Sequence, residues 1–310
     1  MSSNTTTAAN TNNNNNSDLP NVPAACLFAV LFFLVTMVHT YQLFRTRTWW
    51  LLPFLIGGYL EWIGFINRAL TAYPNTFTSQ TPDILNVLFI LIAPVWFAAS
   101  IYIVFGRIII LVDGHHLSFV RQKWLTVIFV CSDILCFLIQ AGGAVILTSN
   151  SAKTNQNTVN TAKTVIDIGL VAQIVAFGIF IVTAISFHWR LTRRPTGPSM
   201  SAEVPWRKHL YTVYLTSSLI MVRCIFRLVE YVTGTKGYIW QHEAFSYVFD
   251  SSLMLFVMVI FAVNHPSEIR AIITGQGKVV QGLRMKSHAS SVNSTTYELQ
   301  PEAGENPEYR

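Results

Sequence analysis

Apolar residues run along this chain in seven long stretches, which are separated by shorter polar or Gly/Pro-containing segments. A helix needs about 20 apolar residues to cross a hydrocarbon core of roughly 30 Å, and each stretch has that length. The stretches lie at 22–44, 49–70, 84–105, 124–148, 164–187, 210–232 and 244–263. The pattern predicts an all-α membrane protein, folded as a seven-transmembrane-helix bundle.

The two ends of the chain are polar. Residues 1–21 are rich in Asn and contain no Lys or Arg, so we expect a disordered extracellular tail and an uncleaved first helix. Residues 22–263 form the predicted transmembrane domain, and residues 264–310 are expected to be a cytosolic, largely disordered tail. Asn4 and Asn15 begin glycosylation sequons that would lie outside, and the sequence leaves open whether either is modified.

Basic residues predict the orientation, because Lys and Arg in short loops stay on the cytosolic side. Three fall in the first tail and the second, fourth and sixth linkers: Lys153, Lys163 and Lys236. Fifteen fall in the other linkers and the last tail: Arg45, Arg47, Arg107, Arg121, Lys123, Arg190, Arg193, Arg194, Arg207, Lys208, Arg270, Lys278, Arg284, Lys286 and Arg310. The sequence therefore predicts an N-terminus outside and a C-terminus in the cytosol.

Composition agrees with a membrane protein, since 52% of residues are hydrophobic, only 12% are charged, and the mean hydropathy is +0.42. The net charge of +6 does not indicate nucleic-acid binding, because the basic residues serve as topology signals. The four cysteines lie inside apolar stretches and form no C-x-x-C pair, so neither a disulfide framework nor a metal site is predicted.

Ionisable residues inside the predicted helices are the candidates for a functional site, because charges in a bilayer are costly and usually face the bundle interior. Eight such residues occur: Glu61, Arg68, Asp133, Arg223, Arg227, Glu230, Glu243 and Asp250. Gln140 lies seven residues after Asp133, and Tyr247 lies between Glu243 and Asp250. Spacings of four and seven put these residues on single helical faces, which gives four helices one polar stripe each.

The predicted orientation brings most of these stripes to the outer half of the membrane. We therefore expect a polar substrate-binding cavity between the second, fourth, sixth and seventh helices, open to the outer leaflet. The alternative is structural pairing, of Glu61 with Arg68 or Arg223 and of Glu230 with Arg227. Five acids against three arginines leave two carboxylates over, and a cationic amphiphile would supply the missing charge.

Six segments together resemble the fungal RTA-like, or lipid-translocating exporter, family. They are EWIGFINR (61–68), LIAPVWFAASIYIVFGRII (91–109), SDILCFLIQAGG (132–143), RCIFRLVEYVTGTKGY (223–238), EAFSYVFD (243–250) and HP (265–266). The resemblance covers the whole bundle in order and spares the tails, and Phe65 stands where the family more often has Tyr. It implies resistance to toxic amphiphiles, export of sphingoid long-chain bases and, in one branch, porphyrin or haem traffic.

Competing functions fit less well. A membrane metalloenzyme needs His and Asp ligands grouped in the core, and here no two histidines share a core face. The last helix has no lysine for retinal, and 275–279 lacks the spacing and hydroxyl of a phosphate-binding loop. We therefore expect no enzyme activity and no cofactor. The open alternative to a lipid exporter is a seven-helix lipid-sensing receptor or regulator with a cytosolic signalling partner.

The expected partners are a membrane lipid or amphiphile and the bilayer itself, without nucleic acid. The plasma membrane is the expected location, with another endomembrane as the alternative. Proton coupling through Glu61, Asp133 or Asp250 is a further hypothesis, because no other energy source for transport is visible in the sequence.

Overall fold

Seven helices long and apolar enough to span a membrane are present in the computed structural model, which confirms the predicted bundle. The structure describes residues 22–71, 81–118, 122–148, 155–201, 204–233, 245, 247–281 and 284–289. The elements that build the spans are α1 (Val22–Thr46), η1 (Trp49–Leu51), α2 (Leu52–Thr71), α3 (Thr81–Leu111), α4 (Gln122–Thr148), α6 (Gln156–Arg193), α8 (Trp206–Thr233), the π-helix η2 (Tyr247–Ser252) and α11 (Leu253–Val263).

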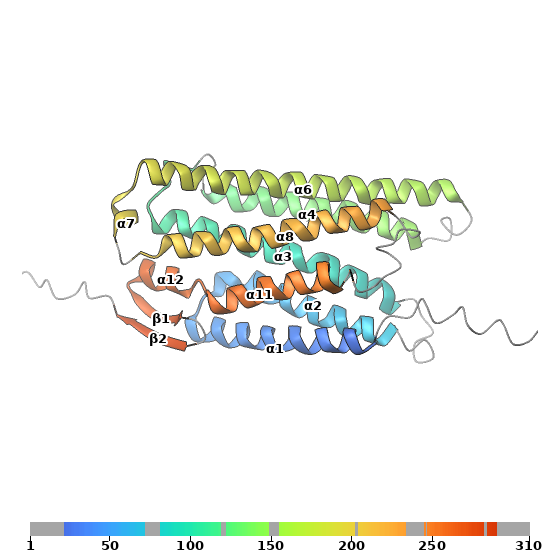
Figure 1. The fold of residues 1–310 in the computed structure, drawn as a ribbon, viewed down its shortest axis with the longest axis horizontal. Coiled ribbons are helices and arrows are strands. Elements are labelled where there is room, and N and C mark those ends of the chain that lie inside the picture. Colours follow the sequence, from blue (N-terminus) through green and yellow to red (C-terminus); the bar gives the residue numbers. More distant parts are fainter. Residues whose placement is uncertain are drawn as a thin grey trace, which may run out of the picture.

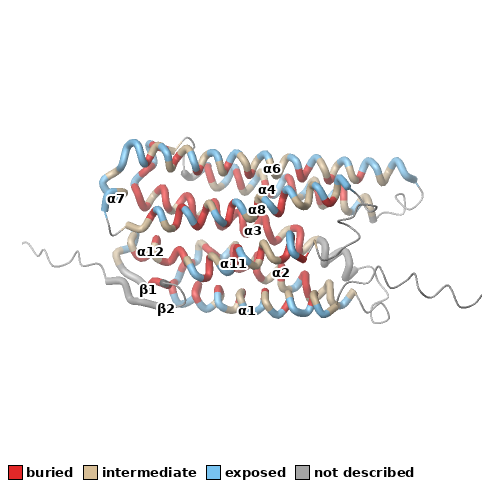
Figure 2. The backbone as a smooth tube through the Cα atoms, in the orientation of Figure 1, coloured by how far each residue is buried: buried red, intermediate tan, exposed pale blue. Residues whose placement is uncertain are grey.

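The helix α3 is the centre of the bundle. In its most apolar stretch, 72% of the residues are buried, whereas only 28% are buried in the corresponding stretches of α1, α4 and α6. Figure 1 shows α4, α6 and α8 along one side of α3 and α1, α2 and α11 along the other. In Figure 2 the buried positions follow the inner faces, while α1 and α6 expose long outer faces. Those outer faces carry large apolar side chains such as Leu34, Val182 and Ile185, which suits contact with lipid.

Glycines allow two helix pairs to approach closely. A Cβ on Gly143 of α4 would lie 2.5 Å from Ile166 Cγ1 and 2.9 Å from the Ala162 carbonyl oxygen on α6. A Cβ on Gly58 of α2 would lie 2.7 Å from Thr36 Oγ1 of α1. The bundle therefore depends on small residues where α4 meets α6 and where α2 meets α1.

The first and last spanning helices are joined by hydrogen bonds near one end of the bundle. His39 Nε2 of α1 donates to the Met258 carbonyl oxygen of α11 over 2.9 Å. Gln42 Nε2 donates to the Ala262 carbonyl oxygen over the same distance. Beyond α11, Arg270 donates to the carbonyl oxygen of Thr46, where α1 ends. These contacts hold α1 against segments more than 200 residues away in the chain.

The segment after residue 263 is folded further than the sequence indicates. It forms α12 (Ser267–Thr274) and an antiparallel hairpin of β1 (Gln276–Gln281) and β2 (Arg284–Ala289). Gly275 ends α12 with φ 69°, and Val279 and Val280 are buried. The disorder expected for 264–310 therefore does not extend to 267–281 or 284–289. The apolar residues Val279 and Val280 are buried, which stabilises the hairpin. Residues 290–310 lie outside the described part.

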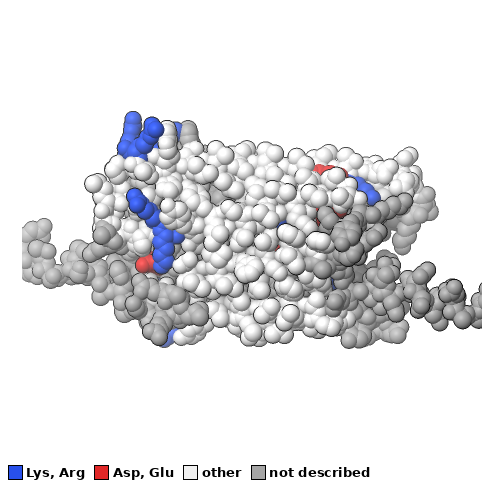
Figure 3. Space-filling view, in the orientation of Figure 1, with Lys and Arg blue, Asp and Glu red and all other residues white. Residues whose placement is uncertain are grey.

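The end that carries α12 and the hairpin also carries α7 (Gly197–Met200), as Figure 1 shows. Lys and Arg side chains gather on the visible face of this end (Figure 3). Arg193, where α6 ends, and Arg207, near the start of α8, are exposed, and Lys208 forms an ion pair with Glu268 of α12 over 3.1 Å. On this face, the basic side chains therefore mark the end that carries α7 and α12.

Candidate functional site

Charged side chains from α8 and η2 meet inside the bundle. The Nε of Arg223 lies 2.5 Å from Oδ1 of Asp250, and both residues are at least 95% buried. Arg223 also donates through Nη2 to the carbonyl oxygen of Ile90 on α3, over 3.2 Å. Arg223 therefore links α8, η2 and α3 in the interior. It pairs with Asp250 and not with Glu61, which was one of the pairings in the structural alternative.

A second ion pair lies further along α8. Arg227 Nη1 and Glu230 Oε2 are 3.1 Å apart, so these residues pair within the helix as the structural alternative expects. On α2, the Arg68 guanidinium lies over the ring of Tyr247, 4.7 Å from its centroid. Arg68, Arg223, Arg227, Glu230, Tyr247 and Asp250 together form what we call the charged cluster.

Glu61 of α2 differs from Glu230 and Asp250, the two acids of the charged cluster, because it forms no ion pair among the described residues. Its side chain is 1% exposed, and neither carboxylate oxygen has a hydrogen-bond partner among the described residues. The charged groups that act on it most strongly are Arg223, Asp250 and Arg227. Glu61 is therefore a buried acid beside ion pairs that are already formed.

Aromatic rings continue from Glu61 towards α1. Phe65, one turn after Glu61, stacks on Phe28 and Phe32 with centroid distances of 5.6 and 5.3 Å. Phe28 also stacks on Tyr247 at 5.5 Å. A cluster of stacked, largely buried rings thus lies beside the buried acid. A polar group next to apolar rings suits a molecule with a polar head and an apolar body.

The π-helical geometry of η2 places Asp250 and Tyr247 in the interior. A π-helix bonds backbone groups five residues apart, and the side-chain hydroxyl of Ser252 adds a hydrogen bond of 3.0 Å to the Tyr247 carbonyl oxygen. Tyr247 and Asp250 are 6% and 4% exposed. Short π segments inside helices occur frequently at functional sites.

The polar stripe of α4 lies elsewhere in the bundle. Asp133 accepts a hydrogen bond of 2.7 Å from the Tyr102 hydroxyl on α3, and Gln140 donates one of 2.9 Å to Gln173 Oε1 on α6. The structure therefore brings together the stripes of α2, α8 and η2, but it turns that of α4 towards α3 and α6. Glu243 lies outside the described residues.

Tyr102 and Gln173, the partners of the α4 stripe, were not among the residues that the sequence singled out. Each is a polar side chain within a long apolar stretch, which is the available signal, but polarity alone does not identify its partner. The stacked rings of Phe28 and Phe32 were also missed, since Phe is ordinary in a membrane helix.

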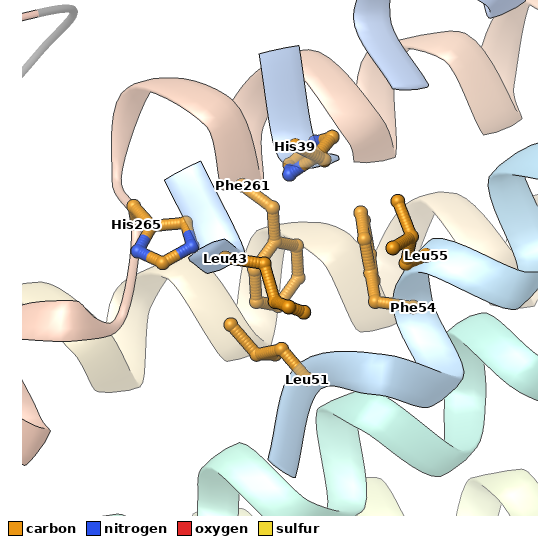
Figure 4. Close-up of a pocket in the computed structure, with 7 residues that line it drawn as sticks. All are labelled: His39, Leu43, Leu51, Phe54, Leu55, Phe261 and His265. Carbon is orange, nitrogen blue, oxygen red and sulfur yellow. The ribbon is translucent and has the colours of Figure 1, made fainter. Parts of the chain in front are cut away.

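A small pocket lies near the other end of α1, away from the charged cluster (Figure 4). Five apolar side chains line it together with His39 and His265. His39 binds the Met258 carbonyl, and His265 Nδ1 accepts from the backbone N–H of Ser267 over 3.2 Å. Both imidazoles thus serve the fold, and within the described ranges no group of three His, Cys, Asp or Glu side chains is placed to hold a metal ion.

The sequence from α2 through most of α12 matches a known family. Residues 54–271 fit the profile described as RTA1 like protein, which is more than two thirds of the chain and includes Glu61 and the charged cluster. The chain belongs to the RTA1-like protein family. The matched range begins after α1, so the rings of Phe28 and Phe32 come from outside it.

Several curated relatives of this RTA1-like protein have names that describe transport or uptake. Protoporphyrin uptake protein 1 of Saccharomyces cerevisiae is 36% identical over 217 residues, covering 69% of this chain and 67% of the relative. Probable lipid transporter atnI of Emericella nidulans is 31% identical, covering 79% and 66%. Sphingoid long-chain base transporter RSB1 of Saccharomyces cerevisiae is 25% identical, covering 92% and 78%.

The chain thus spans about two thirds of the length of the first two of these relatives. No solved structure matches this RTA1-like protein. Together, the family and the seven apolar helices support an integral membrane protein with a role in membrane transport.

Proposed function

We propose that this protein transports amphiphilic lipids, with protonated sphingoid long-chain bases as the substrate class, and thereby gives resistance to toxic amphiphiles. The single observation that carries the proposal is Glu61, a fully buried carboxyl group without a hydrogen-bond partner among the described residues. A buried acid in a membrane helix is costly and usually marks a binding site or pathway. The ammonium head of a sphingoid base is a partner that such an acid would bind.

The surroundings of Glu61 suit the rest of such a molecule. The rings of Phe28, Phe32 and Phe65 would contact the hydrocarbon chain, while the charged cluster would contact hydroxyl groups of the head. Asp133 and Gln140, which bind Tyr102 and Gln173, are left out of this proposed site. The names of the relatives RSB1 and atnI support a lipid substrate.

Orientation and location belong to the same proposal. The end with α7 and α12 would face the cytosol, because Lys and Arg side chains gather there (Figure 3). The head-group site would then open towards the outer leaflet of the plasma membrane. In the present structure Glu61 and Asp250 are 1% and 4% exposed, so the proposed site is closed.

Flux of a labelled sphingoid base in proteoliposomes containing only this protein tests the proposal. The intact protein should move the base faster than empty liposomes, and Glu61→Gln should lower the protein-dependent rate at least about 10-fold, as expected when a charge-assisted contact is lost. Asp167→Asn is the matched control, because it makes the same acid-to-amide change on α6, away from the site, and should transport normally.

Two results would count against the proposal. Well-folded protein without flux would favour the receptor or regulator function, in which a lipid is sensed and not moved. Equal loss of flux in Glu61→Gln and Asp167→Asn would show that any acid-to-amide substitution in the bundle impairs transport. Glu61 would then not be identified as the group that binds the substrate.

A further inference from the structure

We infer that Glu61 holds a proton in the empty protein and exchanges it for the ammonium group of the substrate, so that transport is an exchange of one proton for one amine. This inference rests on the proposed function and adds the energy source that the sequence does not show.

The empty site first requires an uncharged Glu61. An ionised carboxylate in a low-dielectric interior needs hydrogen bonds or a counter-ion, and otherwise it takes up a proton. Within the described part of the chain neither Oε1 nor Oε2 of Glu61 has a hydrogen-bond partner, and its side chain is 1% exposed. These surroundings favour the neutral carboxylic acid over the carboxylate.

The arginines near Glu61 do not supply its counter-ion. Arg223 forms an ion pair with Asp250 and donates to the Ile90 carbonyl, while Arg227 forms an ion pair with Glu230. On Glu61's own helix, Arg68 lies two turns away over the ring of Tyr247. Each positive charge that faces the acid from α8 is thus already balanced by a resident carboxylate.

The other helices around Glu61 offer apolar groups. Phe28 and Phe32 of α1 contact the neighbouring Phe65, and Ile90 of α3 lies against Gly64. The titratable groups that face Glu61 are therefore Arg223 and Arg227 from α8 and Asp250 from η2. A cation that arrives with the substrate would be the first one able to pair with Glu61 alone.

The exchange step balances in atoms and charge. The O–H bond of Glu61 breaks, its proton passes to water, and the carboxylate pairs with the R–NH₃⁺ head group of the base. Protonated Glu61 is neutral, and so is the pair of its carboxylate with the ammonium group. The charge at Glu61 is therefore the same whether a proton or the amine is bound. Exchange across the membrane therefore moves one positive charge each way, which makes it electroneutral.

Two measurable consequences follow from an electroneutral exchange. A proton gradient should drive flux of the base, whereas a membrane potential without a proton gradient should not. Binding should also release a proton, because a ligand that binds only the deprotonated form displaces the proton by linkage.

The experiment uses the full-length protein in weakly buffered detergent near neutral pH, where a sphingoid base is protonated. A pH-indicator dye reports protons, and a radiolabelled base reports binding in the same sample. We expect about one proton released per base bound, as linkage requires for one displaced proton. Ceramide, whose amide nitrogen carries no charge, is the control ligand and should release none.

Variants keep this test independent of folding. Glu61→Asp should retain proton release, while Glu61→Gln should release none even where it still binds the base weakly. Both variants should remain monodisperse, since neither removes a hydrogen bond seen among the described residues. In proteoliposomes, a proton gradient should raise flux of the base through the intact protein several-fold. The rate measured in liposomes with Glu61→Gln is subtracted to correct for passive crossing of the base.

The outcomes separate the inference from the proposed function. Binding and flux without proton release, or flux driven by membrane potential alone, would overturn the exchange and leave the transporter intact. A base that neither binds nor crosses would overturn the proposed function, and the exchange would fall with it. Proton release that persists in Glu61→Gln would assign the proton to another group and overturn the role of Glu61.

Discussion

Two kinds of charged residue lie in the interior of this bundle, and they have different consequences for stability. Arg223 and Asp250 form an ion pair at 2.5 Å, whereas Glu61 has neither an ion pair nor a hydrogen-bond partner within the described residues. Removing one member of a buried pair leaves the other charge uncompensated, while neutralising an unpaired acid does not. The same acid-to-amide substitution should therefore act differently at neighbouring positions.

Asp250→Asn should destabilise the protein by about 3–5 kcal/mol, because it leaves the buried Arg223 guanidinium without its carboxylate. Thermal unfolding in detergent and surface abundance in cells measure the loss. Combining Asp250→Asn with Arg223→Gln should restore part of the stability, and Glu61→Gln is the matched control that should unfold near the parent temperature. If Asp250→Asn were as stable as the parent, Asp250 would be free for a role in binding.

Sequence spacing predicts which residues share a helical face, but not which helix that face meets. It groups Arg223, Arg227 and Glu230 correctly on one face of α8, and Arg227 does pair with Glu230. It cannot show that Asp133 turns to the Tyr102 hydroxyl, because the rotation of α4 is set by packing against α3 and α6. The composition of the candidate site was therefore predictable only in part.

At the scale of the helices, close packing of α4 against α6 rests on Gly143, whose Cβ would lie 2.5 Å from Ile166 Cγ1. Around the neighbouring Gly142, no described atom outside the local helix backbone lies within 4 Å of the ideal Cβ position. The two glycines thus have the same helix propensity and opposite surroundings. This pair allows packing to be separated from backbone effects.

Gly143→Val should separate α4 from α6 and cost about 1–3 kcal/mol, which is the usual range for overpacking. Gly142→Val should stay within about 0.5 kcal/mol of the parent, as surface changes generally do. Thermal unfolding of the purified variants compares them. Equal effects at both positions would mean that the valine acts through the backbone and not through the contact with Ile166.

Element boundaries show what periodicity can predict. Apolar length located all seven spans, yet α6 extends to Gln156–Arg193, beyond the expected 164–187. Its extra first turns begin at Asn155, whose side chain accepts a hydrogen bond from the Asn157 backbone N–H. The hairpin of β1 and β2 escaped prediction because its strands depend on partners outside the hairpin, such as Ser267 Oγ of α12, which accepts from the Val280 N–H.

For the molecule as a whole, the uneven distribution of Lys and Arg makes a prediction about sidedness. An epitope placed before Pro20 should be digested by protease added to intact cells, and one placed beyond Ala289 should be protected until the membrane is permeabilised. The second epitope leaves β2 intact, so folding is not disturbed. The reverse accessibility would place the basic end outside and move the proposed site to the inner leaflet.

The contacts between α1 and α11 have a consequence for how the protein is made. His39 and Gln42 find their acceptors 219 and 220 residues later in the chain. At about 5–20 residues per second, a ribosome needs roughly 10–45 s to synthesise the segment that carries these acceptors. During this time the side chains of His39 and Gln42 in α1 lack their hydrogen-bond partners from α11. A chain that stops before Met258 never satisfies them, so its first helix keeps a polar face that quality control can detect. Replacing His39 and Gln42 by Leu should lengthen the half-life of such a truncated chain, while shortening that of the complete one.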